Sequence, residues 1–296
     1  MEKNPNLNPV QPTTEAYNRA IRELTHANLR LHQLDKAKDE FISIASHELR
    51  NPMAIIKGTL SMIMAGDDGE INTQVRDDLK DVMVVVERQI RLVNELLDIS
   101  RIEAGVIYFN LLPELDIVYV AGLLEASMNL VADQNGVRII VADSPNTPKI
   151  QGDQDKISQV LINLVTNALK FTKNGSITIS FKTEGNFVVT SVSDTGSGMP
   201  EETKEELFKK FTKPGDPTVA TMSAGSGLGL YISKKFVEHH GGKLWLEKSE
   251  IGKGSTFCFS IPISASPEAK KVVQDIAVIQ NLKQVHFKIK ERTKNE

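Results

Sequence analysis

Apolar side chains recur at helical spacing over roughly the first hundred residues, and this pattern predicts two long helices. In the first helix the apolar positions alternate three and four residues apart, as in a coiled-coil seam: Tyr17, Ala20, Leu24, Ala27, Leu31, Leu34 and Phe41. This pattern runs to about Met64, where the turn residues AGDDGE end it. The second helix is predicted from about Thr73 to Glu103, with Val86, Val93 and Leu97 on its apolar face.

The narrow seam of the first helix predicts a partner, because a lone helix cannot bury it. The simplest partner is the same helix in a second subunit, which makes the protein a homodimer. Two antiparallel helices joined by a short turn form a hairpin, and two hairpins form a four-helix bundle. We therefore expect a disordered start over 1–15, a coiled-coil helix over 16–40, and an all-α dimerisation hairpin over 41–104.

The periodicity changes after Gly105, where short strand-like runs alternate with helical stretches. Strands are expected at 108–112, 137–143, 176–181, 186–194, 242–250 and 255–264, and helices at 118–134, 155–169, 201–210 and 228–240. This mixture suggests an α/β sandwich over 105–263, with helices on one face of a mixed sheet. The tail, 264–296, has Val272, Ile276, Ile279 and Leu282 at helical spacing, and two alternatives stay open for it, a helix and a loose segment.

Composition and charge narrow the function classes. The 296 residues are 40% hydrophobic and 25% charged, as in ordinary globular proteins, and are enough for two domains. A net charge of -3 gives no basic field for nucleic acid, and no apolar run approaches the roughly 20 residues of a membrane span. The single Cys258 excludes an internal disulfide, and the N-terminus lacks the apolar core of a secretory signal, so a cytoplasmic protein is expected.

The segment SDTGSGMP, residues 193–200, follows a predicted strand and is the first candidate for ligand binding. Asp194 would lie at the strand end, where its carboxylate can accept a hydrogen bond from an exocyclic amine such as adenine N6. Gly196 and Gly198 lack a Cβ and would let the backbone pass close to a flat ring. Taken alone, the string is more typical of a tight acidic turn.

A second glycine cluster, Gly225, Gly227 and Gly229, stands directly before a predicted helix. Free backbone N–H groups and the positive end of the helix dipole would face a ligand there, which suits phosphate. A plain hinge is the alternative, since glycine-rich helix starts also serve that purpose.

Polar residues share one face of the helix predicted at QVLINLVTNALKFT, residues 159–172. Asn163, Asn167 and Lys170 recur there at i, i+4 and i+7. An amide oxygen can bind Mg²⁺ without adding negative charge beside a triphosphate, and a lysine can neutralise phosphate oxygens. A solvated stripe is the alternative for this segment.

In this order and spacing, the three elements resemble the nucleotide domain shared by histidine kinases, Hsp90 chaperones, gyrases and MutL mismatch-repair proteins, which has the Bergerat ATP-binding fold. The asparagine helix resembles the N box, VSDTGSGMP the first glycine box, LFKKF the F box and GSGLGL the second glycine box. The resemblance covers roughly residues 106–263. The string TKPGDPTVATMSA would be the lid over the nucleotide, with Lys210 and Lys213 near its start.

The stretch FISIASHELRNPMAIIKG, residues 41–58, resembles the H box of bacterial sensor histidine kinases of two-component systems, in which a dimeric hairpin presents a phospho-accepting histidine. Asn51 stands where Thr is commonest in that box. The resemblance implies that His47 is the nucleophile, that Glu48 is its general base, and that Asn51 positions water for phosphatase action. Pro52 lacks an N–H and predicts a bend just past His47.

The whole resemblance implies ATP-dependent autophosphorylation of His47, with ATP and Mg²⁺, and then transfer to an aspartate on the receiver domain of a response regulator. The implied nucleotide-binding residues are Asn163, Asn167, Lys170, Phe171, Asp194, Gly196, Gly198, Lys213, Gly225, Gly227, Leu228 and Gly229, with Asn163 as the metal ligand. The stimulus would come from a separate sensor partner, from a further portion of the chain, or through the coiled coil. Two alternatives stay open, an ATPase clamp or chaperone of the same fold and a non-catalytic dimeric scaffold.

Overall fold

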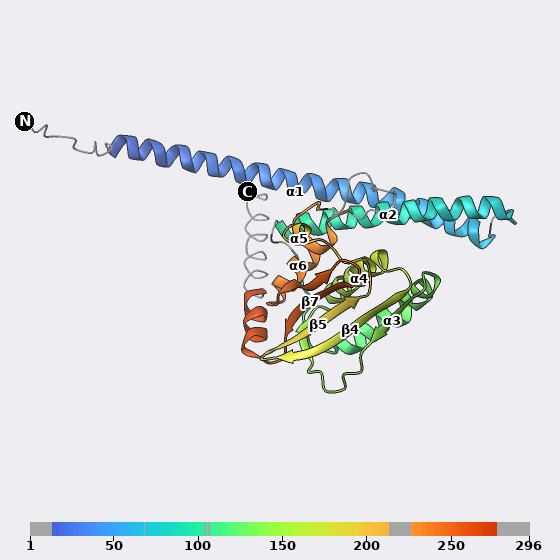
Figure 1. Ribbon diagram of the computed structural model, residues 1–296. Coiled ribbons are helices and arrows are strands. Elements are labelled where there is room, and N and C mark those ends of the chain that lie inside the picture. Colours follow the sequence, from blue (N-terminus) through green and yellow to red (C-terminus); the bar gives the residue numbers. More distant parts are fainter. Residues whose placement is uncertain (1–13, 68, 104, 106, 213–225, 277–296) are drawn as a thin grey trace, which may run out of the picture. The chain divides into compact units, whose positions relative to one another are not determined.

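The computed structural model describes residues 14–67, 69–103, 105, 107–212 and 226–276 of the chain (Figure 1). The chain divides into two compact units, Met1–Val106 and Ile107–Glu296. Almost all of the start that we expected to be disordered, together with Lys213, Gly225 and the end of the tail, lies outside the described residues. No helix in the described part of the chain is long and apolar enough to cross a membrane.

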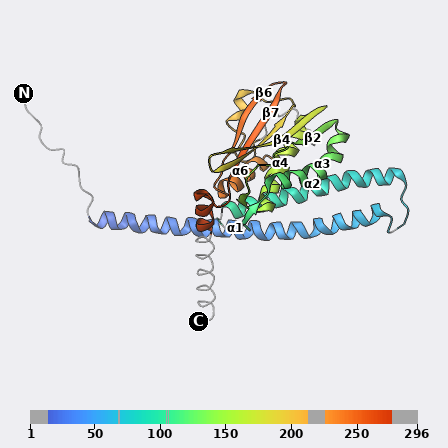
Figure 2. The same cartoon turned by 90° about the horizontal axis from the view of Figure 1, so that it is seen from below.

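The first unit is a hairpin of two long antiparallel helices, α1 (Thr14–Ala65) and α2 (Thr73–Glu103) (Figure 2). Gly66 has a φ of +91° and ends α1, because most residues with a Cβ avoid that conformation. Asn72 caps α2 by accepting a hydrogen bond from the N–H of Val75 at 2.9 Å. The bounds that the periodicity predicted for these helices are therefore confirmed to within two residues.

The hairpin is held by an apolar core and by two polar contacts. Leu60, Val86, Val93 and Leu97 are buried between the helices. The guanidinium of Arg50 donates to Oδ1 of Asn94 from Nε and Nη2, at 3.1 and 2.7 Å, and Lys57 pairs with Glu87 at 2.8 Å. Large apolar side chains of α1 stay exposed in the single chain, and Leu24, Phe41 and Ile55 are 74%, 71% and 70% exposed.

The second unit is built on a five-stranded mixed sheet with the strand order β2-β4-β5-β7-β6. These strands are β2 (Val137–Val141), β4 (Gly175–Glu184), β5 (Phe187–Asp194), β6 (Leu244–Glu250) and β7 (Gly254–Pro262). Only the β2·β4 pair is parallel. Two short strands, β1 (Leu112–Leu115) and β3 (Ile150–Gly152), pair with each other beside this sheet.

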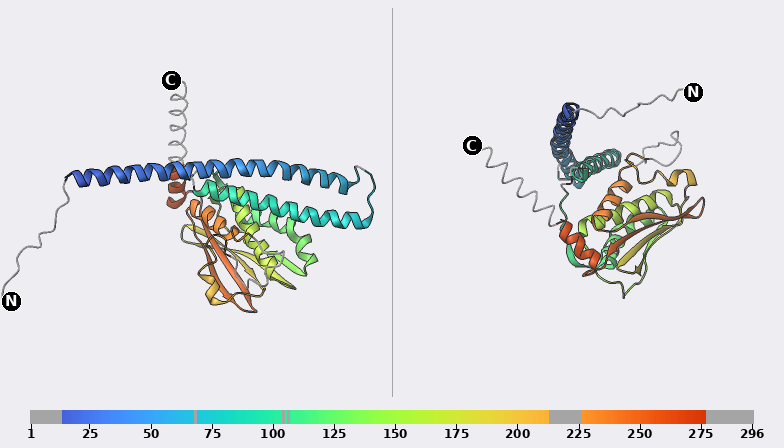
Figure 3. Two further views of the ribbon diagram at one scale, coloured as in Figure 1. Left: turned by 90° about the horizontal axis from the view of Figure 1, so that it is seen from above. Right: turned by 90° about the vertical axis from the view of Figure 1, so that its left-hand side faces the viewer.

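Three helices cover one face of the sheet: α3 (Ile117–Gln134), α4 (Gln154–Phe171) and α6 (Gly229–His239) (Figures 1 and 3). The strand register places Ile179, Val192 and Phe257 side by side, and all three are buried. Side chains alternate between the faces of a strand, so this row marks the apolar face on which the helices pack. The predicted α/β sandwich, a mixed sheet with helices on one face, is confirmed.

Three local predictions were wrong. The strand expected at 108–112 does not form, because Ile107 and Phe109 are buried in an irregular segment and β1 begins only at Leu112. The helix expected at 201–210 is a single turn, α5 (Glu201–Lys204), followed by turns, and Phe211 has a φ of +61° that no α-helix allows. The strand β3 was missed, since three residues are too short to show alternation.

The start of the tail is helical over residues 267–276, which is one of the two alternatives left open for it. Ala269 and Val272 are buried there, and a Cβ placed on Gly241 would lie 2.6 Å from the side chain of Val272. Ile279 and Leu282 lie outside the described residues.

His240, at the end of α6, is buried and holds three segments of the second unit together. Its Nε2 accepts from the N–H of Asp153 at 2.9 Å, so Nδ1 carries the proton and donates to the carbonyl of Phe236 at 2.7 Å. The ring of Phe109 packs edge-on against His240 and stacks on His239, with centroids 5.1 and 5.5 Å away. Burial lowers the pKa of His240 below its ordinary value, and the neutral imidazole is the form that fits.

Candidate active site

Asp194 lies at the end of β5 and is a buried carboxylate in a fixed orientation. Its Oδ1 accepts from the backbone N–H groups of Gly196 and Ser255, at 2.8 and 3.2 Å. Burial raises the pKa of the Asp194 carboxyl, and the two N–H groups offset part of that effect. A buried acceptor aimed by two backbone donors suits the recognition of one specific hydrogen-bond donor.

The glycines after Asp194 are required by contacts with the rest of the unit. A Cβ on Gly196 would lie 2.5 Å from the carbonyl oxygen of Phe171, the last residue of α4. Gly198 has a φ of +64°, and its Cβ would lie 2.0 Å from the carbonyl oxygen of Glu250. The segment therefore runs in close backbone contact between the end of α4 and the turn that joins β6 to β7.

On α4, Asn163 faces the start of α6. Its Nδ2 donates to Oγ of Ser233 at 2.9 Å, and a Cβ on Gly229 would lie 2.3 Å from its Oδ1. Asn167 is half-buried and Lys170 is exposed on the same helix. The Lys170 ammonium lies 5.1 Å from the ring centroid of Phe171, whose side chain is 46% exposed. Asn163, one of the polar residues predicted to share a face of this helix, thus lies directly against Gly229 of the second glycine cluster.

Helix α4 thus adjoins both glycine segments. Asn163 meets Gly229, and Phe171 meets Gly196 eight residues later in the chain, about 12 Å along the helix. A buried carboxylate stands at one of these points and the N-terminus of an eleven-residue helix at the other. This donor and acceptor set fits a ligand with an amine-bearing ring at one end and phosphates at the other.

Gly227 lies against the backbone of Phe211 and Thr212. This glycine has a φ of +74°, and its Cβ would lie 2.7 Å from the carbonyl oxygen of Thr212. Leu228 is only 1% exposed, so its side chain belongs to the core and only its backbone can face a ligand. Lys210 lies with its Nζ 5.1 Å from the ring centroid of Tyr231 on α6. Lys213 and Gly225, both expected in the site, lie outside the described residues.

The residues of the H box lie within α1 of the first unit. His47 is part of the continuous helix, and Glu48 and Asn51 expose their side chains. Asn51 is four residues beyond His47, so the two residues share a helix face. Pro52 is inside the helix, and the bend expected there stays a prediction. Arg50, in the same segment, is hydrogen-bonded to Asn94 of α2, which links the H box to the second helix.

Two family models match the chain. The His Kinase A (phospho-acceptor) domain matches residues 37–105, and the histidine kinase-, DNA gyrase B- and HSP90-like ATPase domain matches residues 152–265. The chain belongs to the histidine kinase family. The resemblance seen in the H box and in the nucleotide motifs is therefore confirmed.

The curated relatives that match this chain come from different organisms. The circadian input-output histidine kinase CikA of Synechococcus elongatus is 32% identical over 247 residues, which cover 81% of this chain and 32% of CikA. The sensor protein SrrB of Staphylococcus aureus is 32% identical over 251 residues, which cover 82% of this chain and 40% of SrrB. The chain thus spans less than half the length of these relatives.

A solved structure shares the fold of this histidine kinase. Full-length ShkA, crystallised in complex with AMPPNP, superposes with a TM-score of 0.63 at 28% identity. The match covers 77% of this chain and 46% of the ShkA chain.

Several residues of the candidate site were missed from the sequence. Ser249 belongs to β6 and Gly254 and Ser255 to β7, and all three contact the segment around Asp194. A Cβ on Gly254 would lie 1.9 Å from the carbonyl oxygen of Asp194. The string GKGST at 252–256 carried a signal, because two glycines between strands indicate a tight turn or a close backbone approach.

Proposed function

We propose that this chain is an ATP-dependent protein histidine kinase that phosphorylates itself on His47. The observation that carries the proposal is the buried Asp194 carboxylate, held by the N–H groups of Gly196 and Ser255, in a chain that also has the H box on α1. A clamp ATPase would need the buried carboxylate but not the H box, and a non-catalytic scaffold would need neither of them.

The residues of the second unit fit ATP as substrate. Asp194 would accept a hydrogen bond from the adenine N6 amine, and the start of α6 at Gly229 would face the phosphates. The side-chain oxygen of Asn163, which lies at Gly229, would hold Mg²⁺. When bound, Mg²⁺ offsets the negative charge of the phosphate oxygens and helps to orient them.

The proposed reaction is an in-line phosphoryl transfer. The lone pair of one imidazole nitrogen of His47 forms a bond to the γ-phosphorus, and the bond from that phosphorus to the β,γ-bridging oxygen breaks, which releases ADP. The proton on the other ring nitrogen passes to Glu48, the next residue along α1. Glu48 is exposed, so it can pass that proton on to water.

The phosphoryl group would then pass to an aspartate on the receiver domain of a response regulator. Asn51, exposed and four residues beyond His47, would position a water that attacks the phospho-aspartate of that regulator, which frees its carboxylate and releases inorganic phosphate. The exposed apolar residues of α1, including Leu24 and Phe41, support a homodimer that buries them in a four-helix bundle continued by a coiled coil.

Incubation with γ-labelled ATP and Mg²⁺ tests the proposal. We expect acid-labile, base-stable label on the wild-type chain and none on His47→Gln. Release of labelled inorganic phosphate with no labelled protein would favour the clamp ATPase, and failure to bind ATP would favour the scaffold. Label that persists on His47→Gln would show that another residue is the nucleophile.

A further inference from the structure

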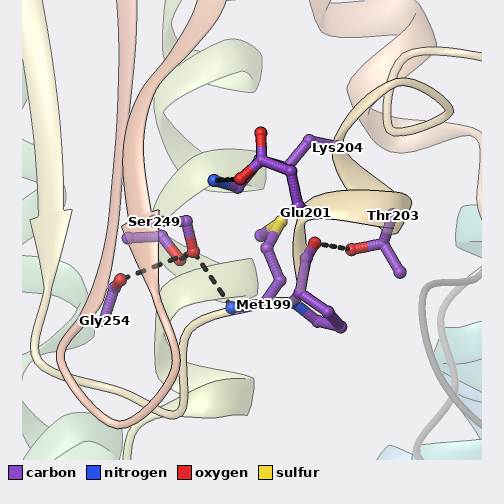
Figure 4. Close-up of polar contacts among 8 residues, drawn as sticks. Met199, Glu201, Thr203, Lys204, Ser249 and Gly254 are labelled. Carbon is purple, nitrogen blue, oxygen red and sulfur yellow. Dashed lines mark hydrogen bonds and ion pairs between the residues drawn. The ribbon is translucent and has the colours of Figure 1, made fainter.

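Ser249, near the end of β6, connects two parts of the nucleotide site through its side chain. Its Oγ accepts from the backbone N–H of Met199 at 3.0 Å (Figure 4). The same Oγ lies 2.8 Å from Oγ of Ser255. The N–H of Ser255 in turn donates to Oδ1 of Asp194. A chain of contacts thus runs from the backbone of Met199 to the carboxylate of Asp194.

The hydroxyl of Ser249 makes its hydrogen bonds with neighbouring residues of the site. A serine hydroxyl has one proton to donate and can accept from other donors. The Met199 N–H occupies an acceptor position, and the short contact with Ser255 joins the two hydroxyls, whichever of them donates. The carbonyl of Gly254 lies farther away, at 3.5 Å. A hydroxyl engaged on both sides holds one conformation.

The other ties between residues 196–200 and the β6–β7 turn use backbone groups. The N–H of Gly252 donates to the carbonyl of Ser197 at 2.8 Å, and Gly198 packs against the carbonyl of Glu250. Two hydrogen bonds between described residues join these two segments. The bond from Gly252 to Ser197 uses backbone atoms on both sides, whereas the bond from Met199 depends on the side chain of Ser249. A substitution at position 249 therefore removes one tie and leaves the rest of the turn in place.

We infer that Ser249 is a positioning residue for nucleotide binding: it holds the segment after Asp194 in register with the Asp194 carboxylate. This inference rests on the proposed function. Without the hydroxyl, the Met199 N–H loses its acceptor, and Met199 is held less firmly relative to the base-binding end of the site. Ser249 would not touch the nucleotide. Loss of its hydroxyl would therefore weaken ADP binding only by disturbing the position of Asp194 and the residues that follow it.

Titration calorimetry of the full chain with Mg-ADP tests this. We expect Ser249→Ala to raise the Kd about tenfold, the size of one lost hydrogen bond, and Ser249→Thr, which keeps the hydroxyl, to stay within about twofold of wild type. Ser191→Ala is the matched control, because Ser191 is also half-buried and its Oγ contacts Sγ of Cys258 at 3.1 Å on a neighbouring part of the sheet. It should bind ADP like wild type.

A double variant separates positioning from general stability. If Ser249 acts through Asp194, the pair Ser249→Ala and Asp194→Asn should bind ADP no more weakly than Asp194→Asn alone, whereas a merely structural role would add its own loss. Three results would each overturn the inference. They are an unchanged ADP affinity of Ser249→Ala, losses of ADP affinity that add in the double variant, and an ADP affinity of Ser249→Thr as low as that of Ser249→Ala. Absence of ADP binding by the wild-type chain would instead reject the proposed function, and this inference with it.

Discussion

The side-chain oxygen of Asn163 faces the Cα of Gly229, so closely that a Cβ at position 229 would lie 2.3 Å from it. The amide is held from its other side by Ser233, four residues beyond Gly229 along α6. Two motifs that are far apart in the chain are therefore one physical unit, in which a glycine leaves the room that an asparagine side chain needs.

Replacement of that glycine should displace the asparagine. Gly229→Ala is expected to push Asn163 away, break its 2.9 Å hydrogen bond to Ser233, and weaken ATP binding about tenfold or more. Gly122→Ala on α3 is the control, since a Cβ there would meet nothing within 4 Å, and it should stabilise the unit by about 0.5–1 kcal/mol. Equal ATP affinity in the two variants would contradict this contact's role.

Gly198 should be among the least replaceable residues of the second unit. Its positive φ costs an alanine about 1–2 kcal/mol, and overpacking against the Glu250 carbonyl adds about 1–3 kcal/mol. Urea unfolding should therefore show a loss of about 2–5 kcal/mol for Gly198→Ala. Gly185→Ala shares a positive φ of +55° but has no atom within 4 Å of its Cβ, so it should lose only the backbone part. Similar losses in both variants would mean that the carbonyl contact carries no cost.

Asp194→Asn should affect binding and stability in opposite directions. The amide can still accept from Gly196 and Ser255 through its oxygen, and it removes a buried charge whose pKa is raised by burial, so the free energy of unfolding at neutral pH should be equal or higher. The amide NH₂ cannot accept from adenine N6, so the Kd for ATP should rise at least about tenfold.

Calorimetry with ATP and urea unfolding check both effects on the same protein. Asp133→Asn, an exposed position on α3, serves as the control and should change neither quantity. If Asp194→Asn bound ATP normally, the carboxylate would have no part in recognising the base.

His240 should make the second unit less stable in mild acid. Burial lowers its folded pKa below the 6.5 of a free histidine, with His239 acting in the same direction and Asp153 and the Phe236 carbonyl opposing it. Between the two pKa values the unfolded chain binds more protons than the folded one, so stability is full above about pH 6.5 and is lost as the pH falls toward the folded pKa. The slope should not exceed about 1.4 kcal/mol per pH unit for this one proton.

Urea unfolding at a series of pH values from 8 to 5 measures that slope. His240→Gln should be less stable at pH 8 but should lose stability less steeply below pH 6.5, whereas His239→Gln should keep the wild-type slope. An unchanged slope in His240→Gln would assign the pH dependence to other groups.

Much of the molecule could be predicted from local patterns. Helix α2 begins at Thr73 and ends at Glu103, as its periodicity indicated, because a long amphipathic helix repeats its signal many times. The strands β4 and β5 followed from alternation, and Asp194, Asn163 and the glycines from their motifs. The short pieces were not predicted correctly. The three residues of β3 carry too little pattern, and the helix expected over 201–210 ends at Lys204, with Phe211 in a left-handed conformation beside Gly227.

The sequence by itself therefore determined the two helices, the class of the second unit, the motifs of a histidine kinase and the residue types of a nucleotide site. Only the tertiary structure decided what surrounds Asp194. Because β7 pairs with β5 and β6 with β7, the β6–β7 turn reaches the end of β5, which brings Ser249, Gly254 and Ser255 to the carboxylate. Alternating side chains specify that a segment is a strand, but strand order depends on how the whole apolar face is buried, and no local pattern contains it.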